Sequence, residues 1–251
     1  MRNDSPSTSV YEQSLSSEGA TYFRLHKTRF AYLISEVARL SARCEHPRRP
    51  VTLLDIGPHF QTTLIRQQLG KSAVINTLGW EISEQIVPAG TVNDHFTFDL
   101  NNSPYREQWV DCPQHDIIVM AEVFEHLYTA PDYFLGFLRT LLKPGGYLLI
   151  GTPNAVSLNH RVGMLVGRNP YERIRTTINN PGHFREYTTA ELSAYSKAAN
   201  FDVESINLSD FYETSSWRKQ LKKYAPTLRD CIHIVLQKNE QPDNVIPLTI
   251  W

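Results

Sequence analysis

The chain has few cysteines, no excess of charge of either sign and no long apolar run, and each absence excludes a class of protein. Its cysteines, Cys44, Cys112 and Cys231, are far apart and in no metal-ligand spacing, which favours a reducing compartment over a disulfide-stabilised secreted scaffold. Lys and Arg number 25 against 26 Asp and Glu, so no net field attracts nucleic acid or an anionic membrane. No run approaches the roughly 20 apolar residues of a membrane span. We therefore expect a cytoplasmic protein with no nucleic-acid partner and no stable membrane insertion.

What the sequence does contain is an alternation of short apolar runs and helical segments. The runs VTLLDI, AVINTLGW, HFTFDL, HDIIVM, GYLLIG, FDVESINL and CIHIVLQ read as strands. Segments such as TLIRQQLG, APDYFLGFLRTLLK and TAELSAYSKAAN lie between them and have helical spacing. This alternation predicts an α/β fold with a doubly wound, Rossmann-like, seven-stranded sheet. The last two runs break the alternation, which favours an antiparallel strand at an edge.

Around this sheet the sequence indicates a single domain with tails and one insertion. Residues 1–19 are polar, rich in Ser and without the apolar stretch of a signal peptide, so we expect a flexible tail. TYFRLHKTRFAYLISEVARL predicts an N-terminal helix that leads into a domain of residues 20–240. Residues 155–181 are too long for an ordinary loop of about 4 to 6 residues, so we expect a lid or substrate-binding insertion. We expect residues 241–251 to form a C-terminal tail.

Acidic residues follow successive strands, where a doubly wound sheet binds its ligands. Asp55 and Gly57 follow the first strand, and glycine lets the backbone approach a ligand at the start of a helix. Glu81 follows the second strand, placed to accept hydrogen bonds from the hydroxyls of a ribose. Asp99 follows the third, where it can read an adenine amine. Each acid alone is as typical of a turn or a cap, but three in this order favour a nucleoside site.

These positions, with HDIIVMAEVFEHLYTAPDYFLGFLRTLLKPGGYLLIGTPN and GHFREYTTAELSAYSKAANFDV, resemble the class I S-adenosylmethionine-dependent methyltransferases. The resemblance is to the bacterial small-molecule or glycan type and implies S-adenosyl-L-methionine as cofactor. It implies that Asp55 and Gly57 shape the methionine pocket, that Glu81 binds the ribose, and that Asp99 with Leu100 frames the adenine.

The same resemblance implies two further cofactor contacts. It places Ala121 beside the sulfonium. The leading helix, with LHKTRFAYLI, is similar to the helix that closes over the cofactor in ubiquinone-pathway O-methyltransferases, which implies that Arg29 pairs with the methionine carboxylate.

The loop LLDIGPHFQTTLIRQQLG departs from the family's DxGxGxG pattern, because His59 and Gln61 replace the later glycines. A dinucleotide needs close approach of its pyrophosphate to such a loop, so the departure argues against an NAD-dependent oxidoreductase. S-adenosylmethionine has no phosphate, so a bulkier loop that still turns can serve methyl transfer. A catalytically inactive, methyltransferase-like binding or regulatory protein is the alternative.

The segment EVFEH follows the fourth strand and contains candidate catalytic residues. If it is helical, Glu122, Glu125 and His126 share one face, where they could hold a hard divalent ion or act as base and orienter. The resemblance to ubiquinone-pathway enzymes supports magnesium there, whereas the same acids at a helix start would only stabilise its dipole. We assign Glu122 and His126 to catalysis and no residue to a metal.

His183 follows the insertion and is either a structural histidine in a hairpin or, together with Tyr187, a residue on the substrate side of the methyl group. We include His183 as the third catalytic candidate. His126 or His183 could take the proton of a hydroxyl acceptor at neutral pH, or a bound metal could lower the pKa of that hydroxyl. The sequence thus predicts a methyltransferase that acts on a small molecule or glycan, at a hydroxyl oxygen.

Overall fold

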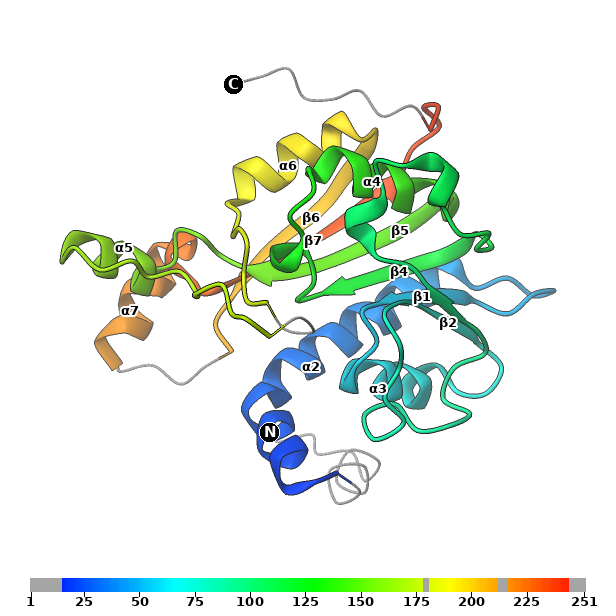
Figure 1. The fold of residues 1–251 in the computed structure, drawn as a ribbon, viewed down its shortest axis with the longest axis horizontal. Helices are drawn as coiled ribbons and strands as arrows, with labels where there is room; N and C mark the ends of the chain where they lie inside the picture. The colour runs from blue at the N-terminus through cyan, green and yellow to red at the C-terminus, as the bar shows by residue number, and fades with distance from the viewer. Residues whose placement is uncertain (1–14, 178–180, 212–215, 244–251) are drawn as a thin grey trace. The chain divides into compact units, whose positions relative to one another are not determined.

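A computed structural model describes residues 15–177, 181–211 and 216–243 (Figure 1). The chain forms two compact units, residues 1–97 and residues 98–251. The expected tails lie largely outside the described residues.

In the first unit, two helices share an aromatic core. Helix α2 (Ser17–Cys44) starts after Ser16, whose hydroxyl accepts a hydrogen bond from the Gly19 N–H. It therefore begins within the last part of the expected N-terminal tail. Helix α3 (Phe60–Leu69) packs against α2 through a cluster of buried side chains, namely Phe23, Phe30, Phe60 and Leu64. Burial of several large apolar side chains, each contributing about 1.5–3 kcal/mol, holds these helices together.

The strands of the first unit are parallel. They are β1 (Thr52–Ile56), β2 (Val74–Gly79) and β3 (His95–Thr97), with β2 in the middle. The apolar run of β1 is buried, as expected for a parallel strand whose two faces are both covered. Ligand-binding residues of this unit are expected just beyond the carboxyl ends of these strands.

The second unit has a mixed set of strands. Here β4 (His115–Ala121) runs parallel to β5 (Leu142–Pro153), while β7 (Cys231–Lys238) lies between β5 and β6 (Phe201–Ser209) and is antiparallel to both. Along the part of the chain that the structure describes, the strand order is β3-β2-β1-β4-β5-β7-β6 in a seven-stranded sheet. The predicted Rossmann-like, seven-stranded sheet with an antiparallel edge strand is confirmed, because β6 at the edge pairs antiparallel with β7.

Helices of the second unit gather in two places (Figure 1). Helices α4 (Pro131–Thr140) and α6 (Thr189–Ala198) pack together over one face of the strands. Helices α5 (Leu158–Leu165) and α7 (Ser216–Tyr224) lie beyond the carboxyl ends of β4 and β5, the end at which parallel strands present ligand-binding residues. The expected insertion thus contains a short helix.

The KPGG turn shows why glycine is needed between α4 and the long part of β5. Gly145 has a φ of 72°, which favours glycine. A Cβ on Gly146 would lie 2.9 Å from the carbonyl oxygen of Lys143 and 3.0 Å from that of Asp116. The two glycines therefore let β5 pass close beside the start of β4.

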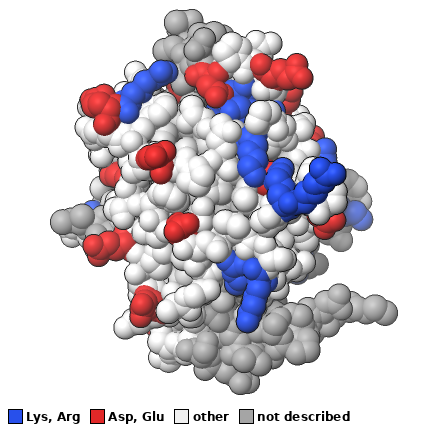
Figure 2. All heavy atoms as spheres, turned by 90° about the vertical axis from the view of Figure 1, so that its right-hand side faces the viewer, with Lys and Arg blue, Asp and Glu red and all other residues white. Residues whose placement is uncertain are grey.

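Among the described residues, no helix combines the length and apolar character needed to cross a membrane. On the face that Figure 2 shows, acidic side chains lie mainly toward the left and the top and basic side chains mainly toward the right, and neither sign covers the face. This mixture agrees with the balanced composition of the whole chain.

Candidate functional site

The loop after β1 makes its turn with one glycine. Gly57 has a φ of 69°, and its N–H donates a hydrogen bond of 2.9 Å to the carbonyl oxygen of Leu78 on β2. The side chain of Gln61, which replaces a later glycine of the family pattern, folds back and donates to the carbonyl oxygen of Gly57 at 3.1 Å. Hydrogen bonds with β2 and with Gln61 of α3 therefore hold the turn.

The bulky residues of this loop belong to the core of the first unit. The Phe60 ring is buried, and the His59 ring packs edge-on against it with centroids 4.3 Å apart. The backbone N–H of His59 donates to the Thr62 hydroxyl at 3.0 Å, which fixes the start of α3. Burial, followed by the charge of Arg29, lowers the pKa of His59 to about 4, so the ring is neutral. The residues that replace glycine thus have structural partners.

Asp55 points a buried carboxylate into this loop. Its Oδ2 accepts hydrogen bonds from the Thr62 hydroxyl at 2.6 Å and from Gln61 Nε2 at 3.5 Å. Its Oδ1 is buried and has no hydrogen-bond partner among the residues that the structure describes. Burial raises the pKa of Asp55 to about 7, although both hydrogen bonds oppose this rise. A buried, incompletely paired carboxyl group is typical of a ligand-binding position.

The other cofactor candidates of the first unit differ in exposure. Arg29 is buried on α2, where its Nη2 donates to the Tyr22 hydroxyl at 3.2 Å and its guanidinium lies 5.6 Å from the centroid of the Phe30 ring. Glu81 is exposed, two residues after the end of β2. The structure therefore holds Arg29 in place and leaves Glu81 accessible to a ligand.

In the second unit, Asp99 begins a short 3₁₀ helix, Leu100–Asn102. Its Oδ1 accepts hydrogen bonds from the backbone N–H of Asn101 at 2.9 Å and from Asn101 Nδ2 at 3.0 Å. The Asp99 carboxylate thus caps a short helix, which is the alternative role that the sequence analysis gave to each of these acids. Leu100 is buried, and Ala121 is half-buried at the end of β4.

The EVFEH segment is not an α-helix, so the condition for one shared helical face is not met. Only Phe124–His126 is helical, as a single 3₁₀ turn. Glu122 precedes that turn with a φ of 55°, and its N–H donates to the carbonyl oxygen of Gly151 at 2.8 Å. A positive φ is uncommon outside glycine, and such strained residues cluster at functional sites.

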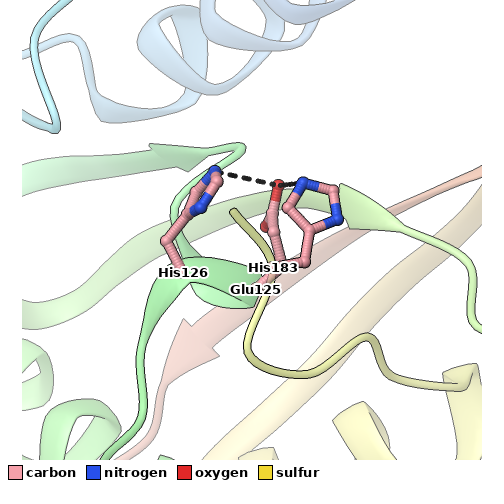
Figure 3. Close-up of side chains that lie close together, drawn as sticks. All are labelled: Glu125, His126 and His183. Carbon is pink, nitrogen blue, oxygen red and sulfur yellow. Dashed lines mark ion pairs between the residues drawn. The ribbon is translucent and has the colours of Figure 1, made fainter. Parts of the chain in front are cut away.

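Instead, Glu125 and His126 meet His183, which comes from the segment that follows the insertion (Figure 3). Glu125 is fully buried, and its Oε2 accepts a hydrogen bond from the Thr152 hydroxyl at 2.9 Å. Its Oε1 lies 4.0 Å from His126 Nε2 and 3.9 Å from His183 Nε2. Figure 3 shows one nitrogen of each imidazole ring facing the Glu125 carboxylate. We call Glu125, His126 and His183 the histidine–glutamate cluster.

The second nitrogen of each imidazole is held by an oxygen. His126 Nδ1 lies 2.8 Å from the carbonyl oxygen of Gly182, and His183 Nδ1 lies 2.9 Å from Glu186 Oε1. A carbonyl or ionised carboxylate oxygen can only accept, so each Nδ1 must donate. In a neutral ring, Nε2 is then the acceptor nitrogen that faces Glu125.

Gly182 is needed for this arrangement. Its φ is 82°, and a Cβ there would lie 2.5 Å from the carbonyl oxygen of Arg173. Only glycine fits such a close approach in this conformation. The Gly182 carbonyl oxygen, which orients His126, therefore depends on glycine at this position.

The electrostatics of the cluster are unusual. Burial, and next the charge of Glu122, raises the pKa of Glu125 to about 8. Burial also lowers the pKa of His126. For His183, burial alone would lower the pKa, but the hydrogen bond to Glu186 and the charges of Glu125 and Glu186 raise it above its ordinary value. The two imidazoles thus differ in their tendency to carry a proton.

The insertion supplies a further acid to the cluster. Glu172 Oε2 lies 3.2 Å from His183 Nε2, and Glu172 also pairs with Arg175. His160 of α5 lies 3.3 Å from Glu186 Oε2, measured from its Nδ1. Sequence reasoning missed Glu172, His160 and Glu186, because no motif marks them. Only Glu186 could have been suspected from the sequence, because it lies three residues after His183.

Tyr187 does not join these residues. Its ring is buried against Phe124, with centroids 4.9 Å apart, and burial is the main cause that raises its pKa to about 12. These contacts are those of a core side chain.

Comparison with known proteins identifies the family. Residues 25–206 match a family model described as "Methyltransferase domain". A probable S-adenosylmethionine-dependent methyltransferase of Mycolicibacterium smegmatis is 33% identical over 36% of this chain and 29% of its own length. The highly reducing polyketide synthase pkhB of Emericella nidulans is 27% identical over 44% of this chain and 4% of its own length. The chain thus spans less than a third of the length of either curated relative.

Solved structures agree on the fold. The N-methyltransferase NodS of Bradyrhizobium japonicum WM9, in complex with S-adenosyl-L-homocysteine, has a TM-score of 0.54 and 13% identity, covering 94% of this chain and 100% of NodS. The plantazolicin methyltransferase BamL, also with S-adenosyl-L-homocysteine, has a TM-score of 0.52 and 18% identity over 93% of this chain and 96% of BamL. The resemblance to S-adenosylmethionine-dependent methyltransferases is therefore confirmed. On the match across residues 25–206, this chain belongs to the methyltransferase domain family.

Proposed function

We propose that this protein transfers a methyl group from S-adenosyl-L-methionine to a small-molecule or glycan acceptor, at a hydroxyl oxygen. The observation that carries the choice of oxygen is the pair of imidazole Nε2 atoms that face Glu125. A hydroxyl must lose its proton as it attacks the methyl group, and imidazoles or a bound ion provide for that loss.

The residues that we propose for the cofactor are those that the resemblance implies. The buried Asp55 carboxylate and the Gly57 turn support a site for the methionine end, and the exposed Glu81 is available to the ribose hydroxyls. The full set that we propose for the cofactor is Arg29, Asp55, Gly57, Glu81, Asp99, Leu100 and Ala121.

The catalytic work of the chain is mainly positioning. The sulfonium supplies the driving force for an in-line displacement, so the protein must align donor and acceptor and exclude water. We assign Glu122, His126 and His183 to the acceptor end, where the hydroxyl proton is removed. The strained backbone of Glu122 supports its place in this set.

The insertion of residues 155–181 is proposed as the lid and the specificity element. Its α5 and the residues after it expose apolar side chains, with Leu165 85% and Val166 63% accessible. Exposed apolar groups of this kind suit an acceptor with a hydrophobic part. The balanced charge of the chain, with 25 Lys and Arg against 26 Asp and Glu, supports an acceptor other than nucleic acid.

Isothermal titration of the purified protein with S-adenosylmethionine and, separately, NAD tests the proposal. We expect micromolar binding of S-adenosylmethionine and no binding of NAD. Glu81→Ala should weaken the former at least about tenfold, because loss of a charge-assisted hydrogen bond exceeds roughly 1.4 kcal/mol. Glu84→Ala, which removes another exposed acid three residues later, is the matched control and should bind as the parent does.

Three results would count against these assignments. Equal affinity in Glu81→Ala and Glu84→Ala would remove Glu81 from the site. Failure to bind either S-adenosylmethionine or S-adenosylhomocysteine would favour the inactive binding protein. Binding without transfer of labelled methyl to hydroxylated acceptors, while amine acceptors are methylated, would overturn the choice of oxygen.

A further inference from the structure

We propose that Glu125, His126 and His183 bind a divalent transition-metal ion, with Glu172 of the insertion as an additional carboxylate ligand. This site was not assigned from the sequence, and it differs from the alternative of Glu122, Glu125 and His126. One carboxylate oxygen and two imidazole nitrogens of the cluster lie within 4.8 Å of one another. Two imidazoles with one carboxylate are a donor set typical of zinc, iron, manganese or cobalt.

The outer contacts of the cluster are those of metal ligands. The imidazole that binds a metal in a protein usually donates its other N–H to a carbonyl or a carboxylate, which fixes the tautomer and orients the ring. His126 makes this contact with the carbonyl oxygen of Gly182, and His183 makes it with Glu186. Glu125 is likewise oriented by the Thr152 hydroxyl through Oε2. All three ligands are thus held with one donor atom directed at the same point.

Direct hydrogen bonds to Glu125 do not explain why the two imidazoles converge on its carboxylate. Glu125 is 0% exposed, and its Oε1 has no hydrogen-bond partner among the residues that the structure describes. The distances of 3.9 and 4.0 Å to the two Nε2 atoms exceed hydrogen-bond length. Two ligands each about 2.1 Å from one ion lie roughly 3.4 Å apart at a tetrahedral angle. Small side-chain rotations would therefore close the cluster around an ion.

Glu172 adds a ligand from the insertion. Its Oε2 lies 3.2 Å from His183 Nε2, and its side chain is 31% exposed, so it can turn toward an ion without leaving a buried gap. A second carboxylate would also balance the charge of a divalent ion. The ion would then hold residues of the insertion to the segment that follows β4.

The choice among metals follows from the ligands. Imidazole nitrogen suits zinc and the other first-row transition ions, whereas magnesium prefers oxygen ligands and retains water. We therefore expect this cluster to discriminate against magnesium. Ion binding is independent of the proposed reaction, while its use there, to lower the pKa of an acceptor hydroxyl, rests on the proposed function.

Metal titration of the full, chelator-treated and tag-free chain tests the site. We expect Zn²⁺ and Co²⁺ to bind at one per chain, with no saturable Mg²⁺ binding at the same concentrations. Bound Co²⁺ should show visible absorption that reports nitrogen and oxygen ligands. His183→Ala and Glu125→Gln should each weaken Zn²⁺ binding at least tenfold, and Glu172→Gln less. His46→Ala removes an exposed histidine outside the cluster and should leave affinity unchanged.

The outcomes separate the metal site from the proposed function. Zn²⁺ binding that is absent, or equal in His183→Ala and His46→Ala, overturns the site. The more conservative His126→Gln serves if His183→Ala fails to fold, as judged by circular dichroism. Binding of S-adenosylmethionine by the metal-free chain is measured in parallel, so a failed metal titration leaves the methyltransferase proposal standing, and a failed cofactor titration leaves the metal site standing.

Discussion

At the scale of single residues, Asp55 is a buried carboxyl group near the end of β1. Burial is the largest cause that raises its pKa to about 7, and the hydrogen bonds from Thr62 and Gln61 only partly oppose it. Because the folded pKa exceeds the ordinary value, protonated Asp55 stabilises the fold below about pH 4, and this stabilisation is lost as the pH rises through 7.

Asp55→Asn should therefore change how stability depends on pH. The amide cannot ionise, so the free energy of unfolding of the variant should gain roughly 3 kcal/mol over the parent between pH 5 and pH 8. Urea unfolding at a series of pH values measures this difference. Asp94→Asn replaces an exposed acid and is the control for the loss of one charge. A constant offset for Asp55→Asn across this pH range would mean that Asp55 is ionised in the folded protein throughout.

At the scale of elements, α7 combines a structural charge with exposed ones. The basic segment WRKQLKKY suggests a solvated helix face, but Lys222 is buried. Its Nζ lies 2.7 Å from Asp210 Oδ1 and 2.8 Å from Asp230 Oδ2. Burial alone would lower the pKa of Lys222, but the two carboxylates raise it. This lysine therefore fastens α7 to the segments around β6 and β7.

Lys222→Met should destabilise the protein by about 3 kcal/mol, because it leaves two carboxylates beside each other without their cation. Lys219→Met, at an exposed position of the same helix, should change stability by less than about 0.5 kcal/mol. Urea denaturation compares them. Adding Asp230→Asn to Lys222→Met should recover part of the loss. If Lys222→Met were as stable as Lys219→Met, Lys222 would not be needed to stabilise the two neighbouring carboxylates.

At the scale of the whole molecule, family membership leads to an expectation about ligand-dependent stability. Any ligand that binds only the folded chain stabilises it, by about 2.7 kcal/mol at 100 times its Kd. For a chain of this size that corresponds to a rise in Tm of about 5–10 °C.

S-adenosylhomocysteine should accordingly raise the Tm, whereas NAD at the same concentration should not. Differential scanning fluorimetry of the parent and of Glu81→Ala measures the shift, which should be smaller in the variant at equal ligand concentration. A rise with NAD equal to that with S-adenosylhomocysteine would point to a general nucleotide site in place of a methyl-donor site.

Local patterns in the sequence were enough for the strands and the turn after β1. Short apolar runs predict the strands, and those of β1 and β4 are buried because parallel strands inside a sheet are covered on both faces. The position of Gly57 predicts the turn, because a left-handed backbone favours glycine. The match to the methyltransferase domain family agrees with motifs that lie within single segments, such as KPGG.

Only the tertiary structure decided which side chains meet. Spacing within EVFEH suggested that Glu122 joins Glu125 and His126, but a 3₁₀ turn and a positive φ place Glu122 outside that helical turn. His183 joins Glu125 and His126 through a chain path that returns after the insertion, and Gly182 fixes that path. The position of β7 between β5 and β6 was likewise visible only in the tertiary structure. Contacts between distant segments depend on packing, which no local pattern records.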